Sequence, residues 1–384
     1  MSWHGIRTIA ALELRQRLRT SRWPIVFGIW VLLIAGVSFL SYWATNDPDL
    51  RSGSAMYDIV VFFVLGLSML IVPSLTATSV NGDREHGVLA TLQTTLLTPW
   101  DIALGKLLSA WVVALAFLAT ALPFLAWAWF EGGISGGRIV LSLLVLVLVL
   151  AVTCAIGLMF STLTARTVSS AVLTYLTMGA LVFGTTIGFG LSAFLVTQQE
   201  TQQVHGIPDN WYEQHQPPAF DPADPNLTPE QIEELQKANQ QPTRADCTTF
   251  TRRTTVAHTE RIWWILPLNP FVVVADAAPS APRKENGIYS SGFTPMRWIS
   301  AGARAARNGP GAEVEDSCAR DVAMFSGDYT DEGSDDPLQK ALDTAPVWPY
   351  GLAFLLLAGG GATVLAGSRL RTPIRRLPNG TRIA

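Results

Sequence analysis

An uninterrupted apolar run over residues 139–163 constrains this chain more than any other feature. The run, IVLSLLVLVLVLAVTCAIGLMFSTL, contains no ionisable side chain except the thiol of Cys154. A helix needs about 20 apolar residues to cross the hydrocarbon core of a bilayer, and this run is longer than that. Charged residues make up only 15% of the chain, against about 25% in an average soluble domain. The chain is therefore predicted to be an integral membrane protein, which excludes a purely soluble enzyme.

Five further segments are long and apolar enough to span a membrane as helices. We expect transmembrane helices at residues 23–43, 55–80, 104–130, 139–163, 168–196 and 347–367. One acid, Asp58, lies inside the second of them near one end. At that depth a hydrated, structural role is favoured over a functional one. The predicted fold class is an all-α polytopic membrane protein with six transmembrane helices.

Basic residues at the two ends of the chain predict its orientation. Residues 1–22 contain five arginines and one acid, Glu13, and residues 368–384 contain five arginines and no acid. Positive charge is retained on the inner side of a membrane, so both termini are predicted to be cytoplasmic in the cell membrane. The even number of spans agrees with this. The apolar segment after residue 22 is too long for the core of a cleavable signal peptide.

The segment between the fifth and sixth spans, residues 197–346, is then expected to be extracytoplasmic. It contains 12 Lys/Arg and 22 Asp/Glu, a net charge of −10, although the whole chain has only −3. It is long enough to form a small domain. Residues 261–278 within it are apolar but too short and too rich in proline to span, so we expect a re-entrant or interfacial segment.

Two of the three cysteines, Cys247 and Cys318, lie in this predicted outer segment. Because that compartment is oxidising, we expect the two to form a disulfide. The alternative is a pair of free thiols.

Residues 1–22 are predicted to form an amphipathic helix on the inner membrane surface. Its apolar residues recur every four positions and so share one face, at Ile6, Ala10, Leu14 and Leu18. Such a helix is either a plain membrane anchor or a specific docking element, and the sequence leaves both open. Residues 368–384 form a basic cytoplasmic tail.

The inner connection between the second and third spans, residues 81–105, is longer than an ordinary connector. Its charged opening contains Gly82 and Gly87, and Thr98-Pro99 ends it. Between the glycines and Thr98-Pro99, the apolar residues have helical spacing, at Val88, Leu89, Leu92 and Leu96. We therefore expect a short cytoplasmic helix here, whereas the other inner connection, around residues 164–167, is nearly a bare turn.

Motifs for catalysis and for nucleotide or metal binding are absent from the sequence. No GxxxxGK[ST] phosphate loop occurs, because Gly105-Lys106 is followed by Leu107. There is no GxSxG elbow, no HExxH and no cysteine pair at zinc spacing. We expect no catalytic residue, no metal site, no cofactor bound by this chain and no nucleic-acid partner.

These features together resemble the permease subunit of an ABC transporter of the type-2 exporter class. One point of resemblance is the order of the elements, with an arginine-rich amphipathic helix first and a long outer segment before the last span. A second is the motif that runs from Asp83-Arg-Glu-His-Gly to Thr98-Pro99 and on to Gly105-Lys106, which is similar to the family's coupling segment. The third is Pro267-Leu-Asn-Pro-Phe271, which is similar to the start of the family's re-entrant outer region.

The resemblance implies that the loop 81–105 sits in a groove of a separate cytoplasmic ABC ATPase, which binds the ATP and Mg. A second permease subunit, identical or paralogous, would complete the pump in the membrane lipid. The implied coupling residues are Asp83, Arg84, Glu85, Gly87, Leu89, Pro99 and Lys106, and the implied re-entrant motif is Pro267, Asn269, Pro270 and Phe271. We expect Glu85 to anchor the ATPase by a charge pair, and the alternative is a solvated loop charge.

Charged groups are scarce within the predicted spans, which favours export of a hydrophobic or amphipathic substrate over a small ion. The alternative function is a membrane-anchored binding or sensing protein that acts through its extracytoplasmic domain. An ABC ATPase that co-purifies with the chain would discriminate between the two. An intramembrane enzyme is disfavoured because the spans contain no paired catalytic groups.

Overall fold

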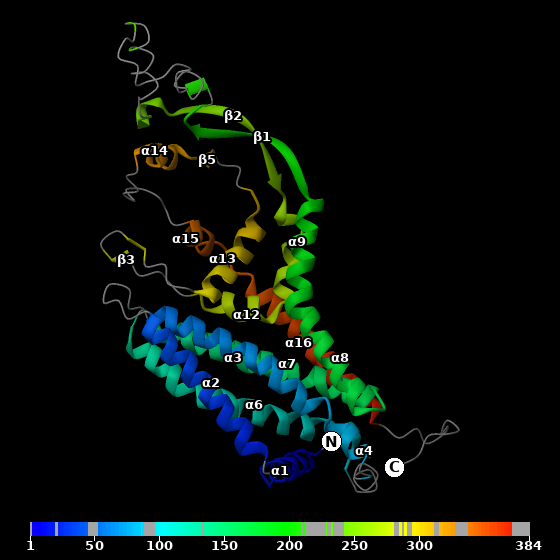
Figure 1. Cartoon of the computed structure of the whole chain (residues 1–384). Helices are drawn as coiled ribbons and strands as arrows, with labels where there is room; N and C mark the ends of the chain where they lie inside the picture. The colour runs from blue at the N-terminus through cyan, green and yellow to red at the C-terminus, as the bar shows by residue number, and fades with distance from the viewer. Residues whose placement is uncertain are drawn as a thin grey trace.

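The spans of this protein form a helical bundle, and a mixed helix and strand segment lies at one end of it (Figure 1). The computed structural model describes residues 2–19, 22–44, 53–85, 87, 97–132, 134–208, 210–211, 228, 232, 242–279, 284–285, 288–289, 294–310, 315–326 and 337–370. Within these residues, six helices are long and apolar enough to cross a membrane. The prediction of a mostly helical, six-span membrane protein is therefore confirmed.

The six spans differ in regularity. They are α2 (Arg22–Ala44), α3 (Gly53–Thr76) with its short extension α4 (Ser79–Glu85), α6 (Pro99–Phe130), α7 (Gly136–Leu163), the composite of α8 (Thr167–Gly179), η1 (Ala180–Gly184) and α9 (Thr185–Leu195), and α16 (Trp348–Arg369). A turn at residues 77–78 separates α3 from α4, and the second span as a whole covers Gly53–Glu85, which contains the predicted range 55–80. The element η1 is a π-helical turn, which widens the fifth helix at its middle.

The centre of the bundle is α7, which packs against α3, α6 and α16. Small residues make these crossings close. Gly157 of α7 has no room for a Cβ beside Thr76, and a Cβ on Gly359 of α16 would come within 3.0 Å of the Val152 side chain. Lipid tails are as apolar as a neighbouring helix, so helices in a bilayer associate through such close packing rather than through burial of apolar surface.

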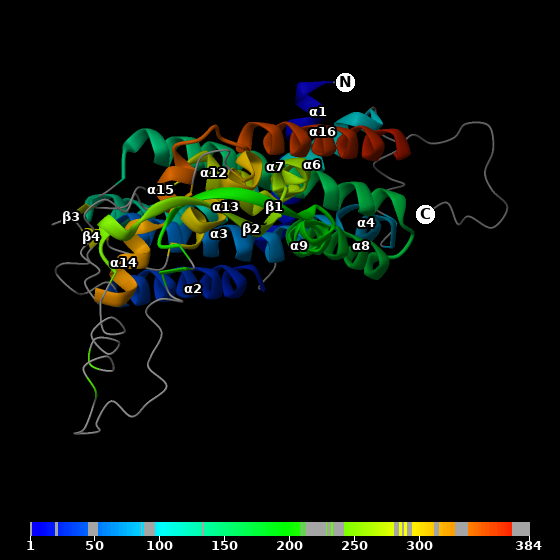
Figure 2. The same ribbon diagram turned by 90° about the horizontal axis from the view of Figure 1, so that it is seen from above.

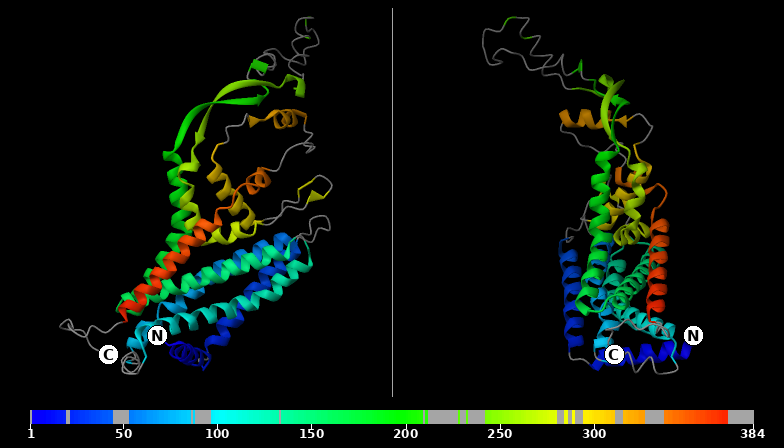
Figure 3. Two further views of the ribbon diagram at one scale, coloured as in Figure 1. Left: turned by 180° about the vertical axis from the view of Figure 1, so that it is seen from behind. Right: turned by 90° about the vertical axis from the view of Figure 1, so that its right-hand side faces the viewer.

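The helix α1 (Trp3–Arg19) lies across one end of the bundle (Figure 1, Figure 3). The last turn of α16 lies at the same end, and the strands at residues 197–206 and 248–257 lie at the opposite one (Figure 3). We call these the α1 end and the hairpin end of the bundle. The start and the end of the spanning region therefore share one side, as an even number of spans requires.

A long β-hairpin continues directly from the fifth span. The strand β1 (Thr197–Gly206) begins two residues after the end of α9 and pairs antiparallel with β2 (Thr248–Ala257). The short strand β5 (Glu315–Asp316) adds parallel to β1 beside Val204 and His205. The hairpin curves away from the bundle (Figure 1). No strand is predicted for this segment from the sequence.

Short helices fill the space between the hairpin and the spans. They are η2 (Arg244–Asp246), η3 (Thr259–Arg261), η4 (Trp263–Leu268), α12 (Pro270–Ala277), α13 (Pro295–Asn308), α14 (Cys318–Ser326) and α15 (Pro337–Leu342), and β3 (Lys284–Glu285) pairs with β4 (Ile288–Tyr289). The apolar segment 261–278 forms η4 and α12. The helix α12 is almost wholly buried and lies on α7 and α16, and α13 packs on it (Figure 2).

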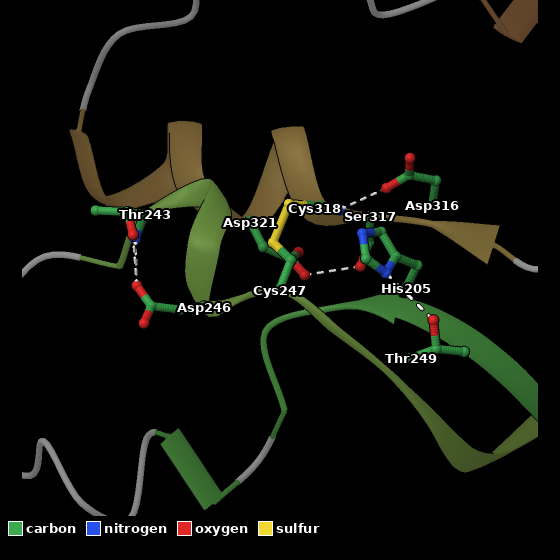
Figure 4. Close-up of a disulfide and its surroundings, with 9 residues drawn as sticks. All are labelled: His205, Thr243, Asp246, Cys247, Thr249, Asp316, Ser317, Cys318 and Asp321. Carbon is green, nitrogen blue, oxygen red and sulfur yellow. Dashed lines mark hydrogen bonds between the residues drawn. A yellow bond between two sulfur atoms is a disulfide. The ribbon is translucent and has the colours of Figure 1, made fainter.

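A disulfide between Cys247 and Cys318 joins the start of β2 to the start of α14 (Figure 4). Their Cα atoms are 5.8 Å apart, and the sequence separation is 71 residues. Beside the bond, the backbone amide of Ser317 donates to the His205 carbonyl at 2.8 Å. Gly206 has no room for a Cβ because the Ser317 hydroxyl and the Asp321 carboxylate lie against it. The far end of the hairpin is thus held by α14.

Replacing Cys247 with serine is expected to loosen the hairpin and α14 by about 4 kcal/mol, because the unfolded segment regains the freedom of a loop of 71 residues. Backbone amides of β1 and β2 should then exchange with deuterium about a thousandfold faster in the purified protein. Cys154→Ser is the control, since this thiol is buried in α7 and is not disulfide-bonded. Unchanged exchange in Cys247→Ser would contradict the role of the disulfide.

Candidate functional site

The third span begins with a complete helix cap at Thr98-Pro99, inside the predicted loop 81–105 and five residues before the predicted start of the span at 104. The Thr98 hydroxyl accepts from the Asp101 amide at 3.2 Å, and the Asp101 carboxylate accepts from the Thr98 amide at 3.0 Å. Pro99 occupies the first position of α6, where its missing N–H has no cost. The other oxygen of Asp101 accepts from the amide of Ser2 at 2.9 Å. The start of α6 is therefore fixed in direction and tied to the start of the chain.

The helix α1 lies directly on the first turns of α6 because Gly105 has no side chain. A Cβ at this position would come within 2.7 Å of the Ile9 Cβ and 3.0 Å of the Ile6 carbonyl oxygen. The glycine of the Gly105-Lys106 motif thus sets the spacing between these two helices. Any larger residue would force α1 away from the bundle.

Lys106, the next residue, is the centre of a buried ion cluster at the α1 end. Its side chain is 1% exposed, and its ammonium group contacts the Glu13 carboxylate from α1 and lies 2.5 Å from Asp83 Oδ2 of α4. The Ser79 carbonyl accepts a third hydrogen bond at 3.0 Å. Arg17 lies 3.9 Å from Glu13, so two cations balance two carboxylates. Such balance is what makes buried charge tolerable.

The helix α4 is also joined to the turn between the fourth and fifth spans. Asn81 is fully buried, and its side-chain amide donates to the Thr164 hydroxyl at 3.0 Å. The Arg84 guanidinium donates to the Thr164 carbonyl at 3.3 Å. The Glu85 carboxylate accepts from the Thr167 amide at 3.4 Å, at the first turn of α8. Four spans and α1 therefore meet around this short helix.

Five of the seven coupling residues that the resemblance implies fall into three groups. Asp83 and Lys106 meet in the buried cluster, Arg84 and Glu85 contact the 164–167 turn, and Pro99 starts α6. Gly87 adopts a positive φ of 72°, which favours glycine. Leu89 lies outside the described residues. Two residues that make these contacts are not predicted from the sequence, Glu13 of the Lys106 cluster and Asn81 of α4. Glu13 could have been noticed as the only acid among the arginines of residues 1–22.

The motif Pro267-Leu-Asn-Pro-Phe271 forms a second joint, at the hairpin end. The Asn269 side-chain oxygen accepts from the Phe271 amide at 2.9 Å and caps α12, which begins with Pro270. The Asn269 amide nitrogen donates to the Val182 carbonyl at 2.8 Å, inside the π-helical turn of the fifth span. A π-turn breaks the regular pairing of backbone groups, so an added donor stabilises it.

The other motif residues contact the second and sixth spans. The Phe271 ring lies 5.2 Å from the Phe62 ring of α3, centroid to centroid. The Pro267 carbonyl lies against Gly351 of α16, where no Cβ fits. One short motif thus contacts three spans that are far apart in sequence.

A buried aspartate holds the start of the sixth span. Asp276 of α12 is 0% exposed, and its Oδ2 accepts from the amides of Val347 and Trp348 at 2.6 and 2.8 Å. Its Oδ1 accepts from Arg304 Nε at 2.5 Å and from the Ser300 hydroxyl at 2.7 Å. Both carboxylate oxygens are therefore fully bonded. Asp276 was not predicted from the sequence, although it is the only acid within the apolar segment 261–278.

Asp58 has a structural role, but it is not hydrated as expected. Its side chain is buried in α3 and accepts from the amides of Met296 and Arg297 at 2.8 and 3.4 Å. These are the first free amides of α13, where a carboxylate is favoured by the helix dipole. The difference arises because α13 covers this end of α3.

A histidine joins the base of the hairpin to η3. The ring nitrogens of His258 lie 2.8 Å from a Glu260 oxygen and 3.0 Å from a Glu200 oxygen. The backbone amide of His258 donates to the Val196 carbonyl, at the end of the fifth span. The hydrogen bond to Glu260, followed by that to Glu200, raises the pKa of His258. No cluster of three or more His, Cys, Asp or Glu that could hold a metal is found among the residues described.

Comparison with known protein families agrees with this architecture. Residues 4–189 match the family model of the ABC-2 type transporter. The match runs from α1 into α9 and so includes the Lys106 cluster. No curated protein matches the chain. Residues 4–189 therefore form an ABC-2 type transporter domain, in agreement with the permease subunit that the motifs resemble.

Lys106→Met is expected to destabilise the α1 end by about 3–5 kcal/mol, because Glu13 and Asp83 keep their charges without the cation. The thermal midpoint of the purified protein measures this. The triple variant with Glu13→Gln and Asp83→Asn should recover most of the loss, since no buried carboxylate is left without its cation and Arg17 keeps its hydrogen bond to the Leu75 carbonyl. Lys340→Met, an exposed lysine at the hairpin end, is the control. A midpoint equal to the control would contradict the importance of the cluster.

The raised pKa of His258 predicts pH-dependent stability of the contact between the base of the hairpin and η3. Folding raises the pKa above its ordinary value of 6.5, so the stabilisation is complete below pH 6.5 and is lost as pH rises through the raised pKa. Protease resistance of β1 and β2 between about pH 5.5 and 8.5 measures this. His258→Asn should remove the pH dependence in that window. If the variant kept the wild-type profile, another group would be responsible.

Proposed function

We propose that this chain is the membrane-spanning half of an ATP-driven exporter and that a separate ABC ATPase docks on the loop 81–105. The observation that carries the proposal is the buried Lys106, which joins both borders of this loop to α1. A loop that only connected two spans would not need its borders fixed by a desolvated ion cluster. A loop that is moved by a partner needs such fixed borders, because the movement must be passed on to the spans without loss.

The path of that movement follows from the contacts around α4. A displacement of the loop would move α4 and the start of α6 together, since Asp83 and Lys106 hold them to each other. Asn81, Arg84 and Glu85 would carry it to the turn before the fifth span. Packed cores shift between discrete arrangements rather than deform continuously, so a small movement can switch the bundle.

ATP and Mg belong on the partner, because this chain has no phosphate loop. In this proposal the α1 end is cytoplasmic, since the arginines of α1 and Arg369 in the last turn of α16 lie there. A second permease completes the pump. In support, the fifth span is the least buried of the six, and an apolar hollow of about 790 Å³ on it is lined by Val172, Leu176 and Phe183 among others.

The substrate proposed is hydrophobic or amphipathic. The charged side chains of the second and third spans lie near the ends: Asp58 beside α13, Lys106 beside α1. In the described spans the interior between these ends consists of apolar and hydroxyl side chains. A fixed charge is what a path for small ions usually contains, so the arrangement favours a lipid, an amphipathic drug or a hydrophobic peptide.

The decisive experiment is co-purification with an ABC ATPase expressed from a neighbouring gene. Glu85→Ala should weaken ATPase binding about tenfold, because a hydrogen bond from a charged partner contributes roughly 1.5–3 kcal/mol. Glu85→Gln keeps an acceptor for the Thr167 amide and separates the role of charge from that internal contact. Glu131→Ala, at the opposite end of α6, is the matched control.

Two outcomes would contradict this proposal. Unchanged ATPase co-purification and unchanged substrate-stimulated hydrolysis in Glu85→Ala would exclude Glu85 as the anchor. If no ATPase associates with the wild-type chain while residues 197–346 bind a ligand, the alternative of a membrane-anchored binding or sensing protein is correct.

A further inference from the structure

The helix α1 carries a second surface that the coupling function does not use. Its packed face contains Ile6, Ile9, Ala10 and Glu13. The opposite face is exposed along the whole helix and borders a hollow of about 700 Å³. This face is lined by His4, Arg7, Thr8, Ala11, Leu12, Arg15, Gln16 and Arg19.

Positive charge on this exposed face is not balanced within α1. The only acid of the helix, Glu13, lies on the packed face and contacts Lys106. Arg17 also turns inward, where it donates to the Leu75 carbonyl at 2.9 Å. The exposed side of the helix therefore contains three arginines, Arg7, Arg15 and Arg19, that point away from the bundle. No carboxylate of α1 lies on this side. Such a face attracts anions.

An apolar groove of about 410 Å³ runs beside this basic face. It is walled by Trp3 and Ile6 of α1, by α6 residues and by Ala151 of α7, and its lining is almost entirely apolar. Trp3 is 70% exposed. Because Trp3 and Arg7 are four residues apart, they lie one above the other on the helix surface. The apolar groove and the basic face are therefore adjacent.

We propose that α1 binds an anionic phospholipid, with a headgroup phosphate at Arg7 and Arg15 and an acyl chain in the groove between α1, α6 and α7. This goes beyond the proposed docking of an ATPase and does not depend on it. Charge alone would also suit an acidic protein surface. The groove favours a lipid over a protein, because two of its walls are transmembrane helices and its lining is apolar, which suits an acyl chain. A tryptophan beside arginines is also typical of the membrane interface.

The site would make the position of α1 depend on the membrane. Since Glu13 and Gly105 hold α1 against α6, a lipid seated in the groove contacts both helices at once. Each arginine near an anionic surface contributes roughly a fivefold gain in affinity. Two arginines then predict a preference of about 25-fold for an anionic over a zwitterionic lipid with the same acyl chains.

The test uses the delipidated full-length chain in detergent. Dioleoyl phosphatidylglycerol and dioleoyl phosphatidylcholine are titrated separately, and bound lipid is counted by native mass spectrometry. We expect the anionic lipid to bind about 25-fold more tightly, and Arg7→Gln/Arg15→Gln to abolish the difference. Arg7→Lys/Arg15→Lys should keep most of it. The matched control, Arg138→Gln/Arg253→Gln, neutralises two exposed arginines away from α1 and should change nothing.

Ala151→Leu tests the groove, because it fills the apolar wall without changing charge. It should weaken binding of both dioleoyl lipids and leave the preference between them intact. Equal affinity for the two lipids in the wild type would overturn the proposal. So would unchanged lipid binding in Arg7→Gln/Arg15→Gln combined with loss of a co-purifying ABC ATPase, since the basic face would then belong to a protein interface.

Discussion

The buried ammonium group of Lys106 is the interaction on which the α1 end of this structure depends. Glu13, Asp83 and Lys106 are distant in sequence, and each would be costly to bury alone. Together they fix α1, α4 and α6 in one arrangement. Gly105 makes this possible, because only a residue without a side chain lets α1 approach closely enough for Glu13 to reach the lysine. Charge and close packing here specify the same geometry.

The hairpin end is also organised around a buried charge that binds partners from several elements, but this charge is negative. There a carboxylate, Asp276, is at the centre, and its partners are Arg304 and the first amides of the sixth span. Between these two ends the bundle is held by contacts of small and apolar residues, such as Gly359 against Val152. Hydrogen bonds and ion pairs at both ends keep the neighbours of each helix end fixed. Apolar packing in the middle has no preferred direction, so the helices can shift against each other there.

The sequence predicts the parts of this fold whose physical signal is local. Uninterrupted apolar runs predict six spans. The motifs around Gly105-Lys106 and Asn269 are recognisable because they resemble those of a known family, but their role in joining the spans is not predicted. The hairpin is not predicted, because TQQETQQVHG and TTFTRRTTVA lack the alternation of apolar and polar residues that reveals a half-buried strand. Glu13 and Asp276 were missed for a different reason. Their roles depend on partners 93 and 28 residues away, which no local pattern contains.

The junction between α9 and β1 has a mechanical consequence. Only Val196 separates the helix from the strand, and its carbonyl is bonded to the amide of His258. The hairpin is therefore an almost rigid extension of the fifth span. Ten strand residues reach about 33 Å, so a tilt of the span by about 10° would sweep the far end of the hairpin through roughly 6 Å. A rearrangement within the bilayer would be amplified beyond it, at the disulfide where the hairpin meets α14.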